Sequence, residues 1–408
     1  MIELMAPAGG FEAMTAAIHA GADSVYFGIE QLNMRARATM NFTLDDIPEI
    51  VRRCEEAGVK SYITLNTVIY DHDIQLMRNI VKTAKEAGIS AIIAADQSVI
   101  MYASSIGMPV HISTQSNVSN IEAVKFYSHF ADVVVLAREL TLQQVKSIHE
   151  EIEREGIKGP SGRLVRLEIF AHGALCMAIS GKCYLSLHSH NASGNRGACI
   201  QNCRRTYTVI DKEEGIELDI DNEYIMSPKD LCTIDFLDKV IDSGISVLKL
   251  EGRGRSADYV DNVTRCYREA IDSIADGTYG ADKVNDWMER LSRTYNRGFW
   301  DGYYLGRKLG EWSDVYGSKA TQKKIFIGKG VHYFPKINVA EFQVLSHSLK
   351  VGDRVLVTGP TTGVMYADIT ELRVDEKPVE EAVRGQSCSF KVSEKVRPSD
   401  KLYKIVEA

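Results

Sequence analysis

The chain has 408 residues, of which 45% are hydrophobic and 25% are charged, and its formal net charge is −7. This composition excludes a disordered, collagen-like or supercharged chain. The acidic balance excludes a uniformly basic nucleic-acid binder but not a local basic groove. The length predicts two or three domains with ordinary hydrophobic cores.

The first residues lack the basic and apolar regions of a signal peptide, and no apolar run is long enough to span a membrane. We therefore expect a cytoplasmic protein with no membrane partner. In that compartment the eight cysteines serve as thiols, metal ligands or catalytic groups rather than as disulfides.

Short apolar runs alternate with amphipathic helical patterns through the first two thirds of the chain. The runs are Ile2–Pro7, Asp23–Gly28, Lys60–Asn66, Ala91–Asp96, Val110–Ser116, Val133–Arg138, Arg166–His172 and Ile245–Glu251. Strands that alternate with helices in this number favour an α/β fold of the (β/α)8, TIM-like barrel type. An open eight-stranded sheet is the alternative.

The remaining chain predicts three further parts. The gap between the last two runs is too long for one helix, so we expect an insertion over about residues 174–232, at the active-site face of a barrel spanning residues 1–278. A helix at Asp282–Tyr295 and a segment rich in Gly, Arg and aromatic residues predict a connector over 279–323. Alternation of period two over 324–408 predicts a small C-terminal β-barrel domain. Its expected strands are Ile325–Gly328, Val339–Val344, Arg354–Thr358, Met365–Val374, Cys388–Val392 and Leu402–Val406.

Five of the eight cysteines fall inside the predicted insertion, namely Cys176, Cys183, Cys199, Cys203 and Cys232. Thiols clustered in this way indicate a metal site, which is either zinc or an iron–sulfur cluster. Zinc sites usually carry two tight Cys-x2-Cys pairs, and this sequence has none, so the loose spacing favours a cubane cluster. Five unrelated thiols are the alternative. For Cys54, Cys266 and Cys388 we favour an ordinary core position.

Several peptidase and nucleotide motifs are incomplete. His149-Glu150 begins like a zinc-peptidase helix, but Glu153 stands where the second histidine belongs, and no Gly-x-Ser-x-Gly occurs. The segment Gly252–Ala257 imitates a dinucleotide fingerprint, yet no further strand follows to complete the unit. Its two arginines, Arg253 and Arg255, lie at an expected helix start and suit an anion. Solvated arginines in a tight turn are the alternative.

Polar residues at the expected strand ends would point into the barrel mouth, namely Asn66, Asp96, Gln115 and Arg138. Among them we favour Arg138 as a catalytic candidate, because a guanidinium after an apolar run needs a partner. Glu3 lies nearer a strand start. His172, beside Cys176, is either structural or catalytic, and His188 and His190 are weaker candidates.

Basic residues near the insertion and the connector are candidates for contacts with RNA phosphates. They are Arg196, Arg204, Arg205, Lys319, Lys323 and Lys324. An ordinary charged surface is the alternative, since the acidic residues Asp211, Glu213 and Glu214 lie nearby.

Five segments together carry a family signature. They are Ala6–Gly9, Glu168–Ser186, Asn195–Arg204, Met226–Cys232 and Leu250–Arg253. These segments resemble peptidase family U32, and the resemblance runs along the whole chain. The family is named for collagenase-like peptidases, but its well-understood members are iron–sulfur proteins. These act in oxygen-independent or prephenate-dependent hydroxylation of RNA or of ubiquinone precursors. The layout is most similar to the tRNA wobble-uridine hydroxylation branch, whereas the rRNA branch carries a longer C-terminal part.

The resemblance implies a tRNA-modifying enzyme that converts the wobble uridine to 5-hydroxyuridine. It implies an iron–sulfur cluster of the 4Fe–4S type, prephenate as co-substrate and the tRNA anticodon loop as partner, with no DNA. The matching cluster ligands are Cys176, Cys183 and Cys199, followed by Cys232, with Cys203 as the alternative fourth ligand. Arg253 and Arg255 would bind the prephenate carboxylates. A U32-type peptidase, or hydroxylation of rRNA or a quinone precursor, is the alternative function.

Overall fold

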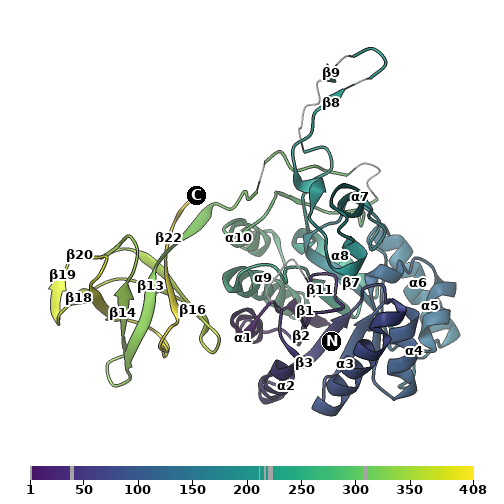
Figure 1. The fold of residues 1–408 in the computed structure, drawn as a ribbon, viewed down its shortest axis with the longest axis horizontal. Coiled ribbons are helices and arrows are strands. Elements are labelled where there is room, and N and C mark those ends of the chain that lie inside the picture. Colours follow the sequence, from purple (N-terminus) through teal and green to yellow (C-terminus); the bar gives the residue numbers. More distant parts are fainter. Residues whose placement is uncertain are drawn as a thin grey trace.

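The computed structural model describes residues 2–36, 41–210, 212–215, 217–218, 224–306, 310–315 and 317–408. Parallel strands form a closed barrel, in which each strand pairs with the next and the last pairs with both β7 and β1 (Figure 1). The strands are β1 (Glu3–Pro7), β2 (Ser24–Phe27), β3 (Lys60–Leu65), β4 (Ala91–Ala94), β5 (Val110–Ile112), β6 (Val133–Val135), β7 (Arg166–Ala174) and β11 (Val247–Leu250). The predicted (β/α)8 barrel is confirmed, and the open-sheet alternative is wrong.

Helices surround the barrel, as Figure 1 shows. They are α1 (Phe11–His19), α2 (Ile47–Glu56), α3 (Ile74–Ala87), α4 (Gln97–Ser105), α5 (Ile121–Ser128), α6 (Leu142–Glu155), α8 (Leu237–Asp242) and α9 (Ala257–Ala275). Side-chain caps from Asp96, Asn120 and Thr141 begin α4, α5 and α6. Glycines in the left-handed conformation end α3 and α6, with Gly88 at φ 90° and Gly156 at φ 65°. Among the described residues, no helix combines the length and apolar character needed to cross a bilayer.

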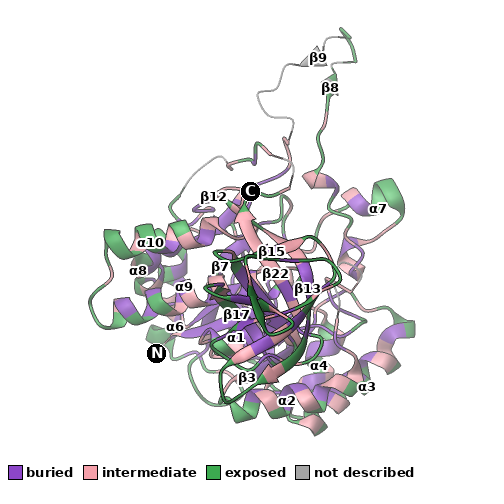
Figure 2. Ribbon diagram, turned by 90° about the vertical axis from the view of Figure 1, so that its left-hand side faces the viewer, coloured by how far each residue is buried: buried purple, intermediate pink, exposed green. Residues whose placement is uncertain are grey.

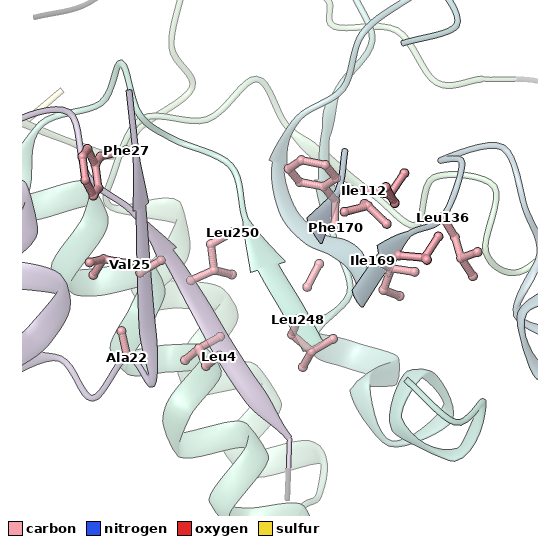
Figure 3. Close-up of a cluster of buried hydrophobic side chains, with 14 of the residues drawn as sticks. Leu4, Ala22, Val25, Phe27, Ile112, Leu136, Ile169, Phe170, Leu248 and Leu250 are labelled. Carbon is pink, nitrogen blue, oxygen red and sulfur yellow. The ribbon is translucent and has the colours of Figure 1, made fainter. Parts of the chain in front are cut away.

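Alternate residues of the strands enter two separate cores. Leu4 and Leu248 point outward into the large apolar core beneath the helices (Figure 3). Their chain neighbours Met5 and Val247 belong to a second cluster inside the barrel. The other members of that cluster are Tyr26, Tyr62, Ala91, Ile93 and Val133. Because successive side chains of a strand point to opposite faces, a parallel barrel buries both faces of its sheet.

A buried ionic network closes the end of the barrel where the strands begin. Glu3 accepts hydrogen bonds from Lys60 at 2.7 Å, from Tyr62 at 2.6 Å and from Arg166 at 2.9 Å. Burial by itself would raise the pKa of Glu3, but these hydrogen bonds lower it to about 2. Glu3 therefore lies at the closed end of the barrel, away from the strand ends that form the opposite mouth.

The predicted insertion between β7 and β11 consists of short elements. They are α7 (Leu185–His190), the two-stranded ribbon of β8 (Val209–Ile210) and β9 (Glu217–Leu218), and β10 (Asp230–Cys232). β10 pairs antiparallel with the end of β7, and β12 (Phe299–Trp300) pairs with β10. Gly173 permits this arrangement, since its φ is 104° and an added Cβ would lie 2.5 Å from the carbonyl oxygen of Glu251.

The C-terminal part is an antiparallel β domain, as predicted. Its main sheet has the order β17-β16-β22-β13-β14-β21-β18-β19. The strands are β13 (Gln322–Phe334), β14 (Val339–Val344), β16 (Arg354–Gly359), β17 (Gly363–Asp368), β18 (Leu372–Val374), β19 (Lys377–Val379), β21 (Ser387–Lys391) and β22 (Lys401–Glu407), with a separate pair of β15 (Ser348–Lys350) and β20 (Glu381–Val383). The expected strand Met365–Val374 is divided between β17 and β18. Within the described chain no ladder joins β17 to β19, so hydrogen bonding does not close this sheet into a barrel.

The β domain packs against the outer helices α1 and α9. Ala16, Ala257, Leu356 and Val364 form a small apolar cluster between the two parts. Lys401 pairs with Glu12 at 2.9 Å across the same contact. The connector contributes α10 (Ala281–Ser292), which packs against α9. The β domain is therefore attached to the side of the barrel.

Candidate functional site

A cavity of about 370 Å³ opens where the barrel strands end. Side chains at the ends of β3, β5, β6, β7 and β11 line it, together with residues of the insertion and of the segment after β2. The carboxyl ends of parallel strands meet at one face of such a barrel, which is where barrel enzymes bind their substrates. None of its lining residues comes from 322–408.

Four cysteines of the insertion line this cavity, namely Cys176, Cys183, Cys199 and Cys203. Cys176 is exposed and the other three are partly buried. Burial raises the pKa of the Cys203 thiol, Arg204 opposes this, and the other three thiols raise the pKa further. The thiols of Cys176, Cys183 and Cys199 are thus close enough to act electrostatically on Cys203.

Cys232 lies outside the cavity. Its Sγ lies 3.8 Å from the Sδ of Met288 and 3.9 Å from the hydroxyl of Tyr267, and the residue is 3% exposed. Burial raises the pKa of its thiol to about 12. The structure therefore separates Cys232 from the other expected ligands and brings Cys203 to them instead, because β10 carries Cys232 into the packing beneath α10.

The donor set fits a cluster better than a single ion. In the parts of the chain that the structure describes, no three His, Cys, Asp or Glu side chains converge to hold one metal ion. In a cubane cluster each thiolate binds a different iron atom, so the ligands stand apart around the cluster. The guanidinium of Arg35 interacts electrostatically with Cys199, and that of Arg204 with Cys203 and Cys176. These cations suit the net negative charge of a thiolate-bound cluster.

Cationic side chains also gather around the cavity, which Arg35, Arg138, Arg204, Lys249, Arg253, Arg255 and Arg297 line. Carboxylates pair with three of them, at 2.9 Å for Arg35–Glu251, 2.8 Å for Lys249–Glu168 and 3.3 Å for Arg297–Asp230. Among the described residues, no carboxylate lies within ion-pairing distance of the other four. The cavity therefore has an excess of positive charge that suits an anionic ligand.

Arg253 is only 5% exposed and is held rigidly in the cavity wall. Its Nη1 donates to Thr64 Oγ1 at 2.9 Å and to Asn33 Oδ1 at 3.1 Å. Gly28 leaves the necessary space, because an added Cβ there would lie 2.4 Å from the same nitrogen. Arg255 also lines the cavity and lies 3.5 Å from the ring centre of Tyr295. The structure thus brings together both arginines that the sequence selected for an anion.

Of the residues expected at the strand ends, Asn66, Gln115 and Arg138 line the cavity. Arg138 lies 4.1 Å from the ring centre of Phe170, while its Nε and the Gln115 Oε1 are buried without a hydrogen-bond partner. Such orphaned polar atoms at a cavity wall are typical of a ligand site. Asp96 does not line the cavity, because its carboxylate caps α4 through Ser98 N at 2.9 Å.

The expected catalytic role of His172 lacks structural support. His172 is 2% exposed and lies among the rings of Tyr259, Tyr267 and Phe299 instead of lining the cavity. Burial lowers its pKa to about 3, so the imidazole is neutral. His188 and His190 are exposed on α7. No histidine of the described chain lines the cavity.

Four of the six basic residues assigned to RNA instead bind other parts of the protein, namely Arg196, Arg204, Lys319 and Lys324. Arg196 donates to Val68 O at 2.8 Å and pairs with Asp73. Arg204 donates to the carbonyl oxygens of Leu175 and Pro228, both at 2.6 Å. Lys324 pairs with Asp258, and Lys319 pairs with Asp314. Arg205 and Lys323 are exposed, as are the acidic residues Glu213 and Glu214. Asp211 lies outside the described residues.

Four charged residues that line the cavity were not expected from the sequence, namely Arg35, Lys249, Glu251 and Arg297. The buried partner of Lys249, Glu168, was not expected either. Lys249 and Glu251 could have been selected from the sequence, because a charged residue inside or directly after an apolar strand must find a partner. Arg35 and Arg297 lie in irregular segments, and no local pattern places them near the barrel mouth. Their roles depend on contacts between distant parts of the chain.

Comparison with known proteins identifies the family of this chain. The family model of peptidase family U32 matches residues 9–314. The chain is 59% identical over 402 residues to a protein of Porphyromonas gingivalis named collagenase, covering 98% of this chain and 97% of that protein. It is 32% identical to tRNA hydroxylation protein P1 of Bacillus subtilis, covering 98% and 94% of the two chains. It is 31% identical to the 23S rRNA 5-hydroxycytidine C2501 synthase of Escherichia coli, covering 75% of this chain and 46% of that enzyme. The predicted resemblance is confirmed, and the chain belongs to peptidase family U32.

Proposed function

We propose that this protein modifies RNA by hydroxylating the wobble uridine of tRNA to 5-hydroxyuridine. The observation that carries the proposal is that four thiols and four arginines without carboxylate partners share one cavity at the barrel mouth. The similarity over nearly the whole chain to a relative named tRNA hydroxylation protein P1 supports a role in tRNA hydroxylation.

In this proposal Cys176, Cys183, Cys199 and Cys203 hold a 4Fe–4S cluster. A bound cluster would supply one-electron redox chemistry next to the substrate. Arg35 and Arg204 stabilise the deprotonated thiolates by their positive charge, which favours ligation. Arg204 also fixes the loop that carries Cys203, because it donates hydrogen bonds to the carbonyl oxygens of Leu175 and Pro228.

Arginines that have no carboxylate within 4 Å among the described residues would bind the two carboxylates of prephenate. Arg253 and Arg255 follow β11, and Arg138 follows β6, so they approach the cavity from different strands. Hydrogen bonds to Thr64 and Asn33 hold Arg253 in place before the ligand arrives. Little conformational entropy is then lost on binding, which is the advantage of a preorganised site.

The target base must leave the RNA and enter this cavity. Anticodon-loop bases are already unpaired, so extrusion costs less than it would from a duplex. The overall acidity of the chain keeps non-specific RNA binding weak. Affinity is therefore expected to be modest and sensitive to salt.

Nucleoside analysis of tRNA from a deletion strain tests the proposal. The deletion should lower 5-hydroxyuridine and its derivatives, wild-type protein should restore them, and Cys176→Ala should not. Cys232→Ala is the matched control, because its thiol lies outside the cavity. Unchanged 5-hydroxyuridine in tRNA, together with loss of a hydroxylated cytidine in ribosomal RNA, would show that the enzyme acts on rRNA. If neither RNA changes, the proposed reaction is rejected.

A peptidase is the second candidate, because a relative with 59% identity is named collagenase. The cavity argues against a Ser–His or Cys–His mechanism, since none of its described lining residues is a histidine. Hydrolysis of gelatin by purified, iron-depleted protein would support this candidate. The same preparation with Cys176→Ala would show whether a cavity thiol is needed.

A further inference from the structure

Exposed apolar side chains occur in the segments of the insertion that line the cavity. In the insertion they are Met177, Ile179, Tyr184, Leu187 and Ile200. Four of them adjoin cavity-lining residues in the chain: Met177 beside Cys176, Ile179 beside Ser180, Tyr184 beside Cys183 and Ile200 beside Cys199. We call these residues, together with Val68 and Tyr70, the apolar collar.

Val68 and Tyr70 join the collar from the segment after β3. The backbone N–H of Val68 donates to the carbonyl oxygen of Asn195 at 3.1 Å, and Asn195 lines the cavity. The guanidinium of Arg196 lies 4.2 Å from the ring centre of Tyr70, whose side chain nevertheless stays exposed. Both segments therefore meet at the same rim.

The collar is exposed although it adjoins a well-packed barrel. Tyr184 is 71% exposed, and Figure 2 shows the outer side of α7 in the colour of exposed residues. Apolar groups gathered at one opening mark a binding surface, whereas scattered ones carry no such meaning. A ligand that covers this rim would bury these groups.

The charge of the cavity decides which ligand fits. Beneath the uncharged collar lie Arg138, Arg204, Arg253 and Arg255, which have no carboxylate within 4 Å among the described residues. The positive potential of these arginines attracts a polyanionic RNA loop to the rim, while Arg138, Arg253 and Arg255 bind prephenate inside the cavity. Such a loop also presents unstacked bases for apolar and aromatic side chains. A protein partner would instead have to insert several carboxylates into the cavity together with its apolar contacts.

We propose that the apolar collar binds the unpaired bases of an RNA loop and that the ring of Tyr184 stacks on one of them. This inference rests on the proposed RNA-modifying function and adds how the loop is recognised. Tyr184 lies next to Cys183 in the chain, so a base stacked on its ring is held at the edge of the cavity. Stacking tolerates any base, so the collar selects unpaired structure rather than sequence.

Fluorescence anisotropy with the iron-loaded full-length protein tests the inference. The probes are a labelled anticodon stem–loop and a fully paired duplex of equal length, at one fixed salt concentration. Wild type should bind the stem–loop more tightly than the duplex. Tyr184→Ala should weaken stem–loop binding about tenfold, while Tyr184→Phe, which keeps the ring, should stay within about twofold. Iron and sulfide contents should remain those of wild type.

Phe126→Ala is the matched control, because Phe126 is a 57% exposed aromatic residue on α5 outside the collar. It should bind the stem–loop like wild type. Equal affinity of wild type for the two probes, or unchanged binding by Tyr184→Ala, would overturn the inference. A protein complex that Tyr184→Ala abolishes, without any RNA binding by wild type, would assign the collar to a protein partner.

The in vivo test separates this inference from the proposed function. If deletion of the gene lowers tRNA hydroxylation but Tyr184→Ala restores it as fully as wild type, the function stands and the collar inference fails. If deletion changes no RNA nucleoside while Tyr184→Ala still loses loop binding, the reaction is wrong and loop binding stands.

Discussion

Cys232 Sγ lies 3.8 Å from Met288 Sδ, in the packing between β10 and α10. This contact places the thiol among apolar side chains, whereas Cys203 lines the cavity with Cys176, Cys183 and Cys199. We therefore expect Cys203→Ala to lose the cluster as completely as Cys176→Ala does, because a missing ligand leaves one iron atom exposed. Iron and sulfide analysis of anaerobically purified protein measures this.

Cys232→Ala should keep the iron content of wild type and lose only stability. Removing a buried sulfur from the core costs about 1 kcal/mol or more, which chemical denaturation detects. Full iron in Cys203→Ala, combined with loss of iron in Cys232→Ala, would contradict the ligand set and require the insertion to rearrange when the cluster binds.

Arg253→Met should weaken prephenate binding about tenfold or more, with normal iron content. The reason is that a charge-assisted hydrogen bond between a guanidinium and a carboxylate contributes about 1.5–3 kcal/mol. Isothermal titration calorimetry with prephenate measures the effect. Arg52→Met, on the outer surface of α2, is the control and should bind like wild type.

Gly28→Ala offers an independent check of the same site without removing any charge. The new Cβ would lie 2.4 Å from Arg253 Nη1 and 2.7 Å from Asn33 Cγ, so the guanidinium must move. Prephenate affinity should therefore fall in this variant as well. Wild-type affinity in both variants would exclude Arg253 from the binding site.

Lys249→Met should destabilise the barrel by about 3–5 kcal/mol, because it leaves the buried Glu168 carboxylate without its partner at 2.8 Å. The double variant Lys249→Met/Glu168→Leu should recover much of this loss, since it removes both buried charges. Urea unfolding monitored by circular dichroism compares the three proteins. A double variant no more stable than Lys249→Met would show that the pair has a role beyond charge compensation.

The lowered pKa of Glu3 predicts that the protein loses stability in acid. Its pKa is about 2 in the folded protein, against a value of 4.5 for an unperturbed glutamate. A lowered folded-state pKa stabilises the protein above about pH 4.5, and this contribution is lost as the pH falls towards 2. The shift corresponds to about 3 kcal/mol.

Glu3→Gln should therefore be less stable than wild type at pH 6, and the difference should shrink below about pH 4.5. Urea midpoints measured at several pH values give the comparison. Glu371→Gln removes an exposed carboxylate paired with Arg373, and its effect should stay below about 1 kcal/mol at every pH. A difference for Glu3→Gln that does not vary with pH would contradict the assigned pKa.

The sequence alone determined the barrel, the insertion and the β domain, because these follow from the local periodicity of apolar residues. It also placed Cys176, Arg138, Arg253 and Arg255 near one mouth, because in a parallel barrel residues shortly after a strand meet at one face. Cys183 and Cys199 were expected there because they lie in the insertion at that face and match the family signature. The local sequence pattern could not decide whether Cys203 or Cys232 is the fourth cluster ligand.

Only the tertiary structure decided how the insertion folds back onto the barrel. The antiparallel pairing of β10 with β7 carries Cys232 into the core, and the hydrogen bonds of Arg204 bring Cys203 to the cavity. The same long-range packing buries His172 and brings Arg35 to Glu251 at 2.9 Å. These placements depend on contacts between residues far apart in the chain, whose energies no short segment of sequence contains.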